Sequence, residues 1–117
     1  MWFHNCVFYQ IYPLNFCGAP ELNSGVQEHR LDRITDYMDR YLSEYGIGGV
    51  YLNPVFSSDT HGYDTRDYRR IDERLGTNEE FRKLVNTAHK RGIRVVLDGV
   101  FHHVGRGFFA FHFTKIA

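Results

Sequence analysis

Ionisable and aromatic side chains gather in two short segments of the sequence. Residues 61–68 read His-Gly-Tyr-Asp-Thr-Arg-Asp-Tyr, so charged groups and aromatic rings surround a flexible glycine. Residues 98–106 read Asp-Gly-Val-Phe-His-His-Val-Gly-Arg and place a carboxylate, two imidazoles and a guanidinium together. Asp98 ends an apolar run, where a carboxylate is costly to desolvate unless it is paired. Asp98 is therefore either a turn cap or ion-pair partner or, the interpretation we favour, a functional carboxylate.

The same residues could suggest a metal site. Asp98, His102 and His103 offer zinc ligands, and His61 or Cys17 could complete the set. Adjacent histidines on an extended segment point in opposite directions, so both cannot easily bind one ion. We predict no metal site in the chain, and a zinc-dependent hydrolase built on Asp98, His61 and His103 is the minor alternative.

Three apolar runs and two helical patterns must position these segments. The runs are residues 6–12, 49–53 and 93–100, and continuous apolar runs are typical of strands buried on both faces. Between them, residues 31–45 carry apolar side chains at helical spacing, and Thr77-Asn-Glu-Glu80 matches a helix capping box. The order β-α-β-α-β predicts parallel strands, because each strand pair is joined through a helix.

The connections in this pattern are unequal. Residues 13–30 and 54–77 form long strand-to-helix loops, whereas the helix-to-strand connections are very short. Long loops at the carboxyl ends of parallel strands are where α/β enzymes keep their sites. The alternating Arg and Asp residues over 66–74 are interpreted as a solvated, locally paired surface, with Asp67 and Arg69 ambiguous.

Length and composition limit the possible classes of protein. The 117 residues allow one modest domain but not a complete barrel of about 250 residues. A formal net charge of zero argues against nucleic acid and anionic membrane partners. No apolar run approaches the ~18 residues of a membrane span, and the N-terminus lacks the features of a secretory signal. We predict a cytoplasmic protein in which Cys6 and Cys17 are reduced thiols.

Two architectures accommodate three parallel strands. A doubly wound nucleotide-binding fold needs a glycine-rich turn after the first strand, and residues 12–20 contain none. The remaining architecture is the opening part of an eight-stranded barrel. Since three strands cannot close a barrel, this second architecture requires further strands.

Five motifs, in order and at matching spacing, resemble the first three β/α units of the α-amylase family of glycoside hydrolases. They are Tyr9-Gln-Ile-Tyr-Pro13, Gly49-Val-Tyr-Leu-Asn-Pro54, residues 61–68, Leu75-Gly-Thr77 and Gly92-Ile-Arg-Val-Val-Leu-Asp98 continuing to His103. The resemblance covers roughly residues 5–111. It implies an α/β fold that is part of a TIM (β/α)₈ barrel, with three parallel strands, two intervening helices and retaining action on α-glucosidic bonds.

The resemblance also implies roles for four residues. Tyr63 would stack on the glucosyl ring beside the scissile bond. Asp64 resembles the carboxylate that holds the terminal sugar's hydroxyls in exo-acting members of the family. Asp98 would orient the catalytic centre, and His103 would form a hydrogen bond to the same sugar. The implied ligand is an α-glucan or a maltooligosaccharide.

The sequence departs from the family pattern in ways that bear on activity. Retaining hydrolysis needs a nucleophile and an acid about 5–5.5 Å apart. In this family both, and a third stabilising Asp, come from later strands, so we expect no catalytic residue here. Asp64 and Asp98 make a poor substitute pair, because the sequence offers nothing that would keep one protonated and the other ionised. His102 stands where the family usually has an Asn that binds calcium in many members, so we expect no calcium.

We therefore expect residues 1–117 to be the N-terminal portion of a catalytic barrel, truncated after the third strand and inactive alone. The pattern is lost after Phe111, which suggests a truncated or frameshifted gene product. The alternative is a stand-alone, non-catalytic α/β module that binds sugar or a partner subunit. Exposed edges of the first and third strands, with the apolar side chains of Phe108, Phe109, Phe111 and Phe113, predict self-association.

Overall fold

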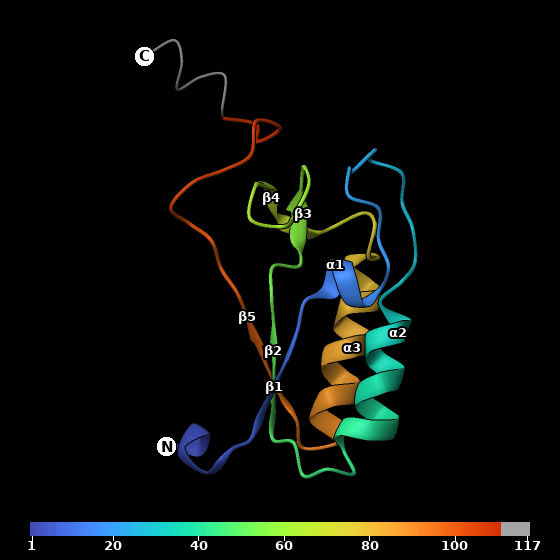
Figure 1. Ribbon diagram of the computed structural model, residues 1–117, viewed down its shortest axis with the longest axis vertical. Coiled ribbons are helices and arrows are strands. Elements are labelled where there is room, and N and C mark those ends of the chain that lie inside the picture. The colour runs from blue at the N-terminus through green and yellow to red at the C-terminus, as the bar shows by residue number, and fades with distance from the viewer. Residues whose placement is uncertain (111–117) are drawn as a thin grey trace.

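The computed structural model describes residues 1–110, which form a three-stranded parallel sheet flanked by helices (Figure 1). The strands lie in the order β1–β2–β5. This arrangement confirms the predicted α/β class and the β-α-β-α-β order. In chain order the elements are η1 (Trp2–Asn5), β1 (Phe8–Ile11), α1 (Pro13–Phe16), α2 (Asp32–Tyr37), η2 (Met38–Leu42), β2 (Gly49–Leu52), β3 (Phe56–Ser58), β4 (Thr65–Ile71), α3 (Asn78–Lys90) and β5 (Arg94–Leu97).

The register of the sheet brings the carboxyl ends of its strands to one edge. Ile11 pairs with Leu52, and Leu52 pairs with Leu97, so the three strands end level with one another. Any residue that directly follows a strand therefore lies beside the residues that follow its neighbours.

Two helices connect these strands, and the sequence signals at their ends are present in the structure. Helix α2 continues into the π-helical turn η2, and Gly46, at φ +69°, follows it in a conformation that favours glycine. The capping box at the start of α3 is complete: the Thr77 hydroxyl accepts a hydrogen bond from the Glu80 backbone N–H, and the Glu80 carboxylate accepts one from the Thr77 N–H. The predicted helix start is confirmed.

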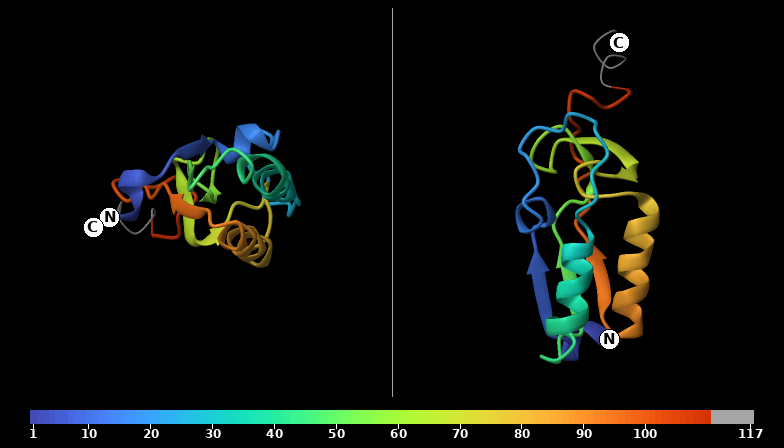
Figure 2. Two further views of the ribbon diagram at one scale, coloured as in Figure 1. Left: turned by 90° about the horizontal axis from the view of Figure 1, so that it is seen from below. Right: turned by 90° about the vertical axis from the view of Figure 1, so that its right-hand side faces the viewer.

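The hydrophobic core lies between the sheet and these helices. Figure 2 shows α2 and α3 side by side along one face of the sheet. Alternate strand residues and one face of each helix fill this layer, namely Ile11, Val50, Leu52, Leu31, Ile34, Met38, Leu42, Leu84 and Ala88. Burial of these side chains holds the sheet in place, and the sheet in turn fixes the residues at its carboxyl edge.

The opposite face of the sheet corrects the prediction of strands buried on both sides. Phe8 is 41% exposed, and with Tyr51 and Val96 it lines an open groove of about 610 Å³. Trp2 of η1 covers part of this groove, with the Arg94 guanidinium 4.6 Å from its ring centroid. Within residues 1–110 no helix layer covers this face. The apolar side chains that the strands carry on this side are therefore not fully buried by the described residues.

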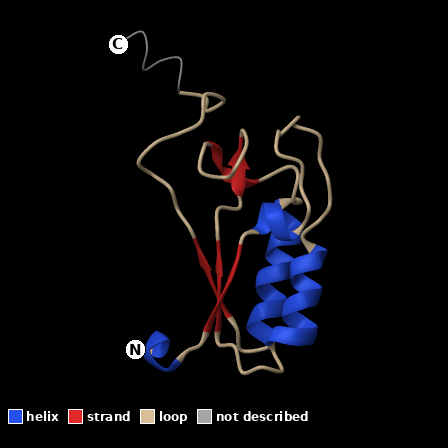
Figure 3. Ribbon diagram, in the orientation of Figure 1, coloured by secondary structure: helices blue, strands red, loops and turns tan. Residues whose placement is uncertain are grey.

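The long loop between β2 and α3 contains a hairpin that the sequence analysis did not predict. Strands β3 and β4 pair antiparallel, with irregular register between them. Figure 3 shows this hairpin beyond the carboxyl ends of the three parallel strands. It therefore stands over the edge at which a site was expected.

Two further expectations concern surface properties. Of the Phe residues expected to add apolar surface for self-association, Phe111 and Phe113 lie outside the described residues, whereas Phe109 is exposed. None of the helices in the described part of the chain combines the length and apolarity needed to span a membrane.

Candidate functional site

The carboxyl edge of the sheet places two polar side chains next to each other. Asn53 follows β2, and its backbone N–H donates to the Ile11 carbonyl at 2.9 Å. Asp98 follows β5, and its backbone N–H donates to the Leu52 carbonyl at 2.9 Å. The parallel ladder thus extends one residue beyond each strand and fixes the backbone of both residues.

A chain of hydrogen bonds crosses this edge and centres on Tyr63. The Tyr63 hydroxyl donates to Asp98 Oδ2 at 3.0 Å and accepts from Asn53 Nδ2 at 2.9 Å. Gln10 Nε2 of β1 donates to Asn53 Oδ1 at 3.0 Å, which continues the chain of hydrogen bonds to β1. The structure therefore brings together Tyr63 and Asp98, two of the four predicted site residues.

Asn53 and Gln10 were not singled out by the sequence analysis, although both lie in motifs that carried the resemblance. Asn53 had a readable signal, because it follows its strand directly, as Asp98 does. Gln10 had a weaker one: it is the polar residue of the apolar strand β1. Its role depends on the register with β2, which the sequence does not show.

Asp64 lies one residue beyond Tyr63 and keeps one oxygen unpaired. Thr60 Oγ1 donates to Asp64 Oδ2 at 2.6 Å. The other oxygen, Oδ1, is buried without a hydrogen-bond partner within residues 1–110, and His61 Nδ1 lies 3.7 Å from it. A buried carboxylate oxygen without a donor is unusual in folded proteins, and this one is closed to a ligand in the structure.

The loop that carries Tyr63 and Asp64 is itself anchored. The Tyr12 hydroxyl donates to the His61 carbonyl, and the Tyr63 backbone N–H donates to His61 Nδ1 at 3.2 Å. Burial raises the pKa of Tyr12, and the neighbouring Tyr63 raises it further. Burial and then the negative charge of Asp98 raise the pKa of Tyr51 at the same edge. Both phenols are therefore neutral donors near neutral pH.

The segment after β5 carries His103, the fourth predicted site residue. Its side chain is exposed and makes no hydrogen bond to another described residue. Its carbonyl accepts a bond from the Tyr68 hydroxyl at 3.3 Å, and the same hydroxyl also bonds the Val100 carbonyl. The backbone of this segment is thus attached to β4, but the structure does not bring the His103 imidazole to Tyr63 or Asp98.

A buried ion pair below the hairpin corrects the interpretation of residues 66–74 as solvated surface. Asp67 and Arg69 are exposed as expected, but Asp72 and Arg74 are only 1% and 2% exposed. Arg74 Nε donates to Asp72 Oδ1 at 2.8 Å, and its Nη2 donates to Asp72 Oδ2 at 2.9 Å. A bidentate pair of this kind tolerates burial because each charge is compensated.

Arg74 Nη1 joins two loops. It donates to the carbonyls of Pro20, Glu21 and Thr60 at 2.7–2.9 Å. These carbonyls belong to the two long loops that follow β1 and β2. The guanidinium therefore holds in place the backbone that carries the candidate site.

Within residues 1–110, the side chains named as possible zinc ligands do not form a cluster. In the part of the chain that the structure describes, no three His, Cys, Asp or Glu side chains lie close enough to share a metal ion. The zinc alternative built on Asp98, His61 and His103 therefore has no geometric support. His102 is exposed at the position where a calcium-binding Asn was expected, and an imidazole is a poor ligand for that ion.

The carboxyl edge can therefore hold a polyhydroxylated ligand by hydrogen bonds and ring contact. Tyr63 offers a partly exposed aromatic ring and Asp98 a partly exposed carboxylate. Aromatic rings with nearby carboxylates are suited to the flat faces and hydroxyl groups of sugars.

Comparison with known proteins decides the family. The family model described as "Alpha amylase, catalytic domain" matches residues 10–115. The chain belongs to the α-amylase family. It is 38% identical to the maltogenic alpha-amylase of Bacillus acidopullulyticus, over 89% of this chain and 20% of that protein. It is also 38% identical to neopullulanase 2 of Thermoactinomyces vulgaris, over 94% of this chain and 22% of that protein.

Solved structures of this family share the fold. The isomaltulose synthase of Erwinia rhapontici superposes with a TM-score of 0.82 at 33% identity, covering 98% of this chain and 20% of that one. The cyclic alpha-maltosyl-(1→6)-maltose hydrolase of Arthrobacter globiformis gives 0.78 at 37% identity, covering 95% and 28%. The chain spans about a fifth of the length of the curated relatives it matches. These matches confirm the predicted partial (β/α)₈ barrel.

Proposed function

We propose that residues 1–117 form the N-terminal portion of the catalytic domain of an α-amylase-type glycoside hydrolase. The complete enzyme would hydrolyse α-glucosidic bonds in α-glucans or maltooligosaccharides with retention. Relatives named maltogenic alpha-amylase and cyclomaltodextrinase support this substrate class. A relative named intracellular maltogenic amylase supports a cytoplasmic location.

The observation that carries the proposal is the hydrogen bond between the Tyr63 hydroxyl and Asp98 Oδ2 at the carboxyl edge of the sheet. It fixes an aromatic ring and a carboxylate from two separate β/α loops as one unit. In this proposal Tyr63 stacks on the glucosyl ring beside the scissile bond, Asp64 holds the terminal hydroxyls, Asp98 orients the reacting centre and His103 forms a hydrogen bond to the same sugar. His103 would have to turn toward the sugar when the ligand binds.

The proposal also predicts that this chain alone binds but does not cleave. The nucleophile and the acid of a retaining glycosidase are absent from its candidate site residues. Purified chain should release no reducing sugar from maltotriose and no nitrophenol from a nitrophenyl α-glucoside. Hydrolysis that disappears in the Asp98→Asn variant would refute this part of the proposal.

The open sheet supports self-association. Strands β1 and β5 are the outer strands of the described sheet, and unpaired edges promote pairing with another chain. We expect oligomers or aggregates in size-exclusion chromatography with light scattering. A sharp monomer peak with cooperative melting would instead favour a stand-alone, non-catalytic module.

A further inference from the structure

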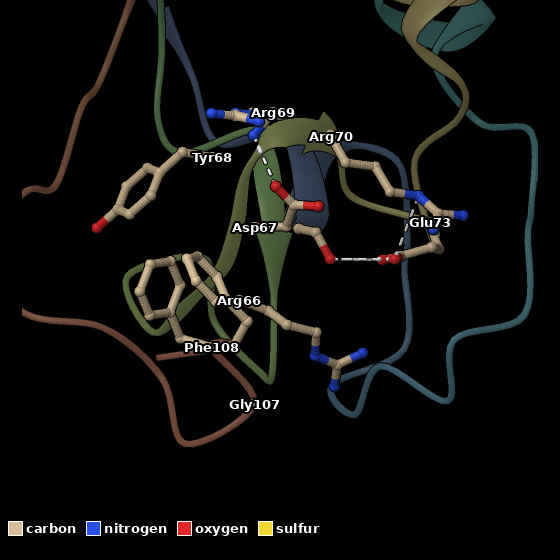
Figure 4. Close-up of a pocket in the computed structure, with 10 residues that line it drawn as sticks. Arg66, Asp67, Tyr68, Arg69, Arg70, Glu73, Gly107 and Phe108 are labelled. Carbon is tan, nitrogen blue, oxygen red and sulfur yellow. Dashed lines mark hydrogen bonds and ion pairs between the residues drawn. The ribbon is translucent and has the colours of Figure 1, made fainter. Parts of the chain in front are cut away.

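A second cavity lies on the hairpin, apart from the Tyr63 and Asp98 residues of the candidate site. Its volume is about 600 Å³, and it is formed by β4 and by residues 107–109. Figure 4 shows Arg70 and Glu73 at one side of this pocket and Phe108 at the opposite side, with Asp67 between them. The volume falls within the range of small-molecule sites, which is about 300–1,000 Å³.

Most charges around this pocket are already paired. Arg66 Nε donates to Asp59 Oδ1 at 2.9 Å, and Arg70 Nε lies 3.4 Å from Glu73 Oε1. Glu73 also accepts hydrogen bonds from Ser57 and from Asn23. These groups form a polar wall in which the charges compensate one another.

The groups left for a ligand are one cation, one anion and an aromatic face. Arg69 is exposed, and its guanidinium has no hydrogen-bond or ion-pair partner within residues 1–110. Asp67 Oδ1 accepts a bond from the Arg69 backbone N–H at 2.8 Å, and its other oxygen is open. Phe108 packs edge-on against Tyr68. The centroid of its ring lies 4.8 Å from the centroid of the Phe109 ring, so the aromatic wall is held from two sides.

This combination favours a neutral ligand over an anion. A phosphate or carboxylate would be attracted by Arg69 but repelled by Asp67, the unpaired carboxylate in the same pocket. A sugar hydroxyl can donate to Asp67 and accept from Arg69 at once, and a pyranose face can stack on Phe108.

We propose that this pocket is a second carbohydrate site, which binds a short α-glucan segment through Phe108, Arg69 and Asp67. The choice of glucan as ligand rests on the function proposed above. The position of the pocket on the hairpin makes it independent of the Tyr63 and Asp98 contacts.

The test is a titration of the ¹⁵N-labelled chain with maltotriose, monitored by amide chemical shifts. Amides of Asp67, Arg69 and Gly107 should shift and saturate, and they should do so equally in the Asp98→Asn variant. Phe108→Ala should weaken binding measured at these amides by roughly 2- to 10-fold, the equivalent of one aromatic contact.

Arg69→Ala should weaken binding at the pocket without unfolding the chain, because the side chain is exposed. Arg82→Ala and Phe16→Ala are matched controls on α3 and α1, and both should bind as the unmodified chain does.

Three results would overturn the second site. They are no shift at the pocket amides, equal binding by the Arg69→Ala or Phe108→Ala variants and their controls, or displacement of maltotriose from the pocket by inorganic phosphate. Failure of the function proposed above would look different. In that case the amides of Tyr63, Asp64 and Asp98 would not respond to maltotriose while the pocket amides still shifted.

Discussion

Replacing Arg74 with Met should destabilise the chain more than any other single arginine substitution in the hairpin segment. The change keeps the unbranched apolar stem of the side chain, as far as the position of Nε, but removes the guanidinium. Asp72, 1% exposed, would then be a buried carboxylate without its cation. The carbonyls of Pro20, Glu21 and Thr60 would also lose their donor.

The magnitude follows from the cost of breaking a buried ion pair. Removing one partner of such a pair costs about 3–5 kcal/mol, because the remaining charge is uncompensated. For a domain of this size each kcal/mol lowers the melting temperature by roughly 4 °C. Arg74→Met should therefore lower the melting temperature by about 12–20 °C, measured by circular dichroism.

Arg82→Met supplies the matched control. The Arg82 and Glu79 side chains are 68% and 76% exposed, and Arg82 Nη1 lies 2.8 Å from Glu79 Oε1. An exposed pair of this kind contributes about 0–1 kcal/mol, so its loss should lower the melting temperature by less than about 4 °C. Equal shifts for the two variants would refute the reasoning.

A double variant separates charge from packing. In Asp72→Asn with Arg74→Met, no uncompensated charge remains, so the double variant should be more stable than Arg74→Met alone. If the double variant were the less stable one, loss of packing and of carbonyl partners would account for the effect instead of the buried charge.

Three further predictions concern single groups. Burial raises the pKa of Cys17 to about 11, so at pH 8.5 only ~0.3% of it is thiolate; iodoacetamide should modify Cys6 first, and equal rates would contradict this. Burial would raise the pKa of Glu73, but hydrogen bonds from neighbouring groups and a nearby arginine outweigh this effect and lower the pKa. The folded chain should therefore lose stability as pH falls below about 4, where Glu73 becomes protonated. The Glu73→Gln variant should lose less stability over the same pH range. Tyr63→Phe leaves the buried Asn53 amide without one acceptor and should cost about 1–3 kcal/mol in urea unfolding, whereas no change would show that water replaces the hydroxyl.

The main elements of the fold could be predicted because each has a local signal. The apolar runs give three strands, and the capping box at Thr77 marks the start of α3 within one residue. The β3–β4 hairpin had no such signal. Its second strand reads Thr-Arg-Asp-Tyr-Arg-Arg-Ile, and its polar residues remain largely exposed, so the pattern resembled a loop surface.

Burial of Asp72 and Arg74 could not be predicted for a different reason. Neighbouring residues 67, 69 and 70 have the same charged character and are exposed. What distinguishes Arg74 is a set of carbonyls more than ten residues away in the chain, at Thr60 and at residues 20–21. Such partners are brought together only by the tertiary fold.

The candidate site could be predicted only in part, because some of its residues have a local sequence signal and others depend on the tertiary fold. Tyr63 and Asp98 were identified from local motifs, and the structure joins them directly. Asn53 and Gln10 complete the hydrogen-bond chain, but their contribution depends on strand register. The role of His103 in sugar binding stays a prediction.

The buried ion pair and the candidate site are mechanically connected through Thr60. Arg74 Nη1 holds the Thr60 carbonyl at 2.7 Å, and the Thr60 hydroxyl donates to Asp64 Oδ2 at 2.6 Å. The same residue thus receives a bond from the buried cation on one side and positions a proposed sugar contact on the other. Since Asp64 Oδ1 has no protein donor among the described residues, the position of that acceptor depends on how firmly Thr60 is held. The stability of the hairpin base therefore affects how well the proposed sugar-binding edge is preorganised.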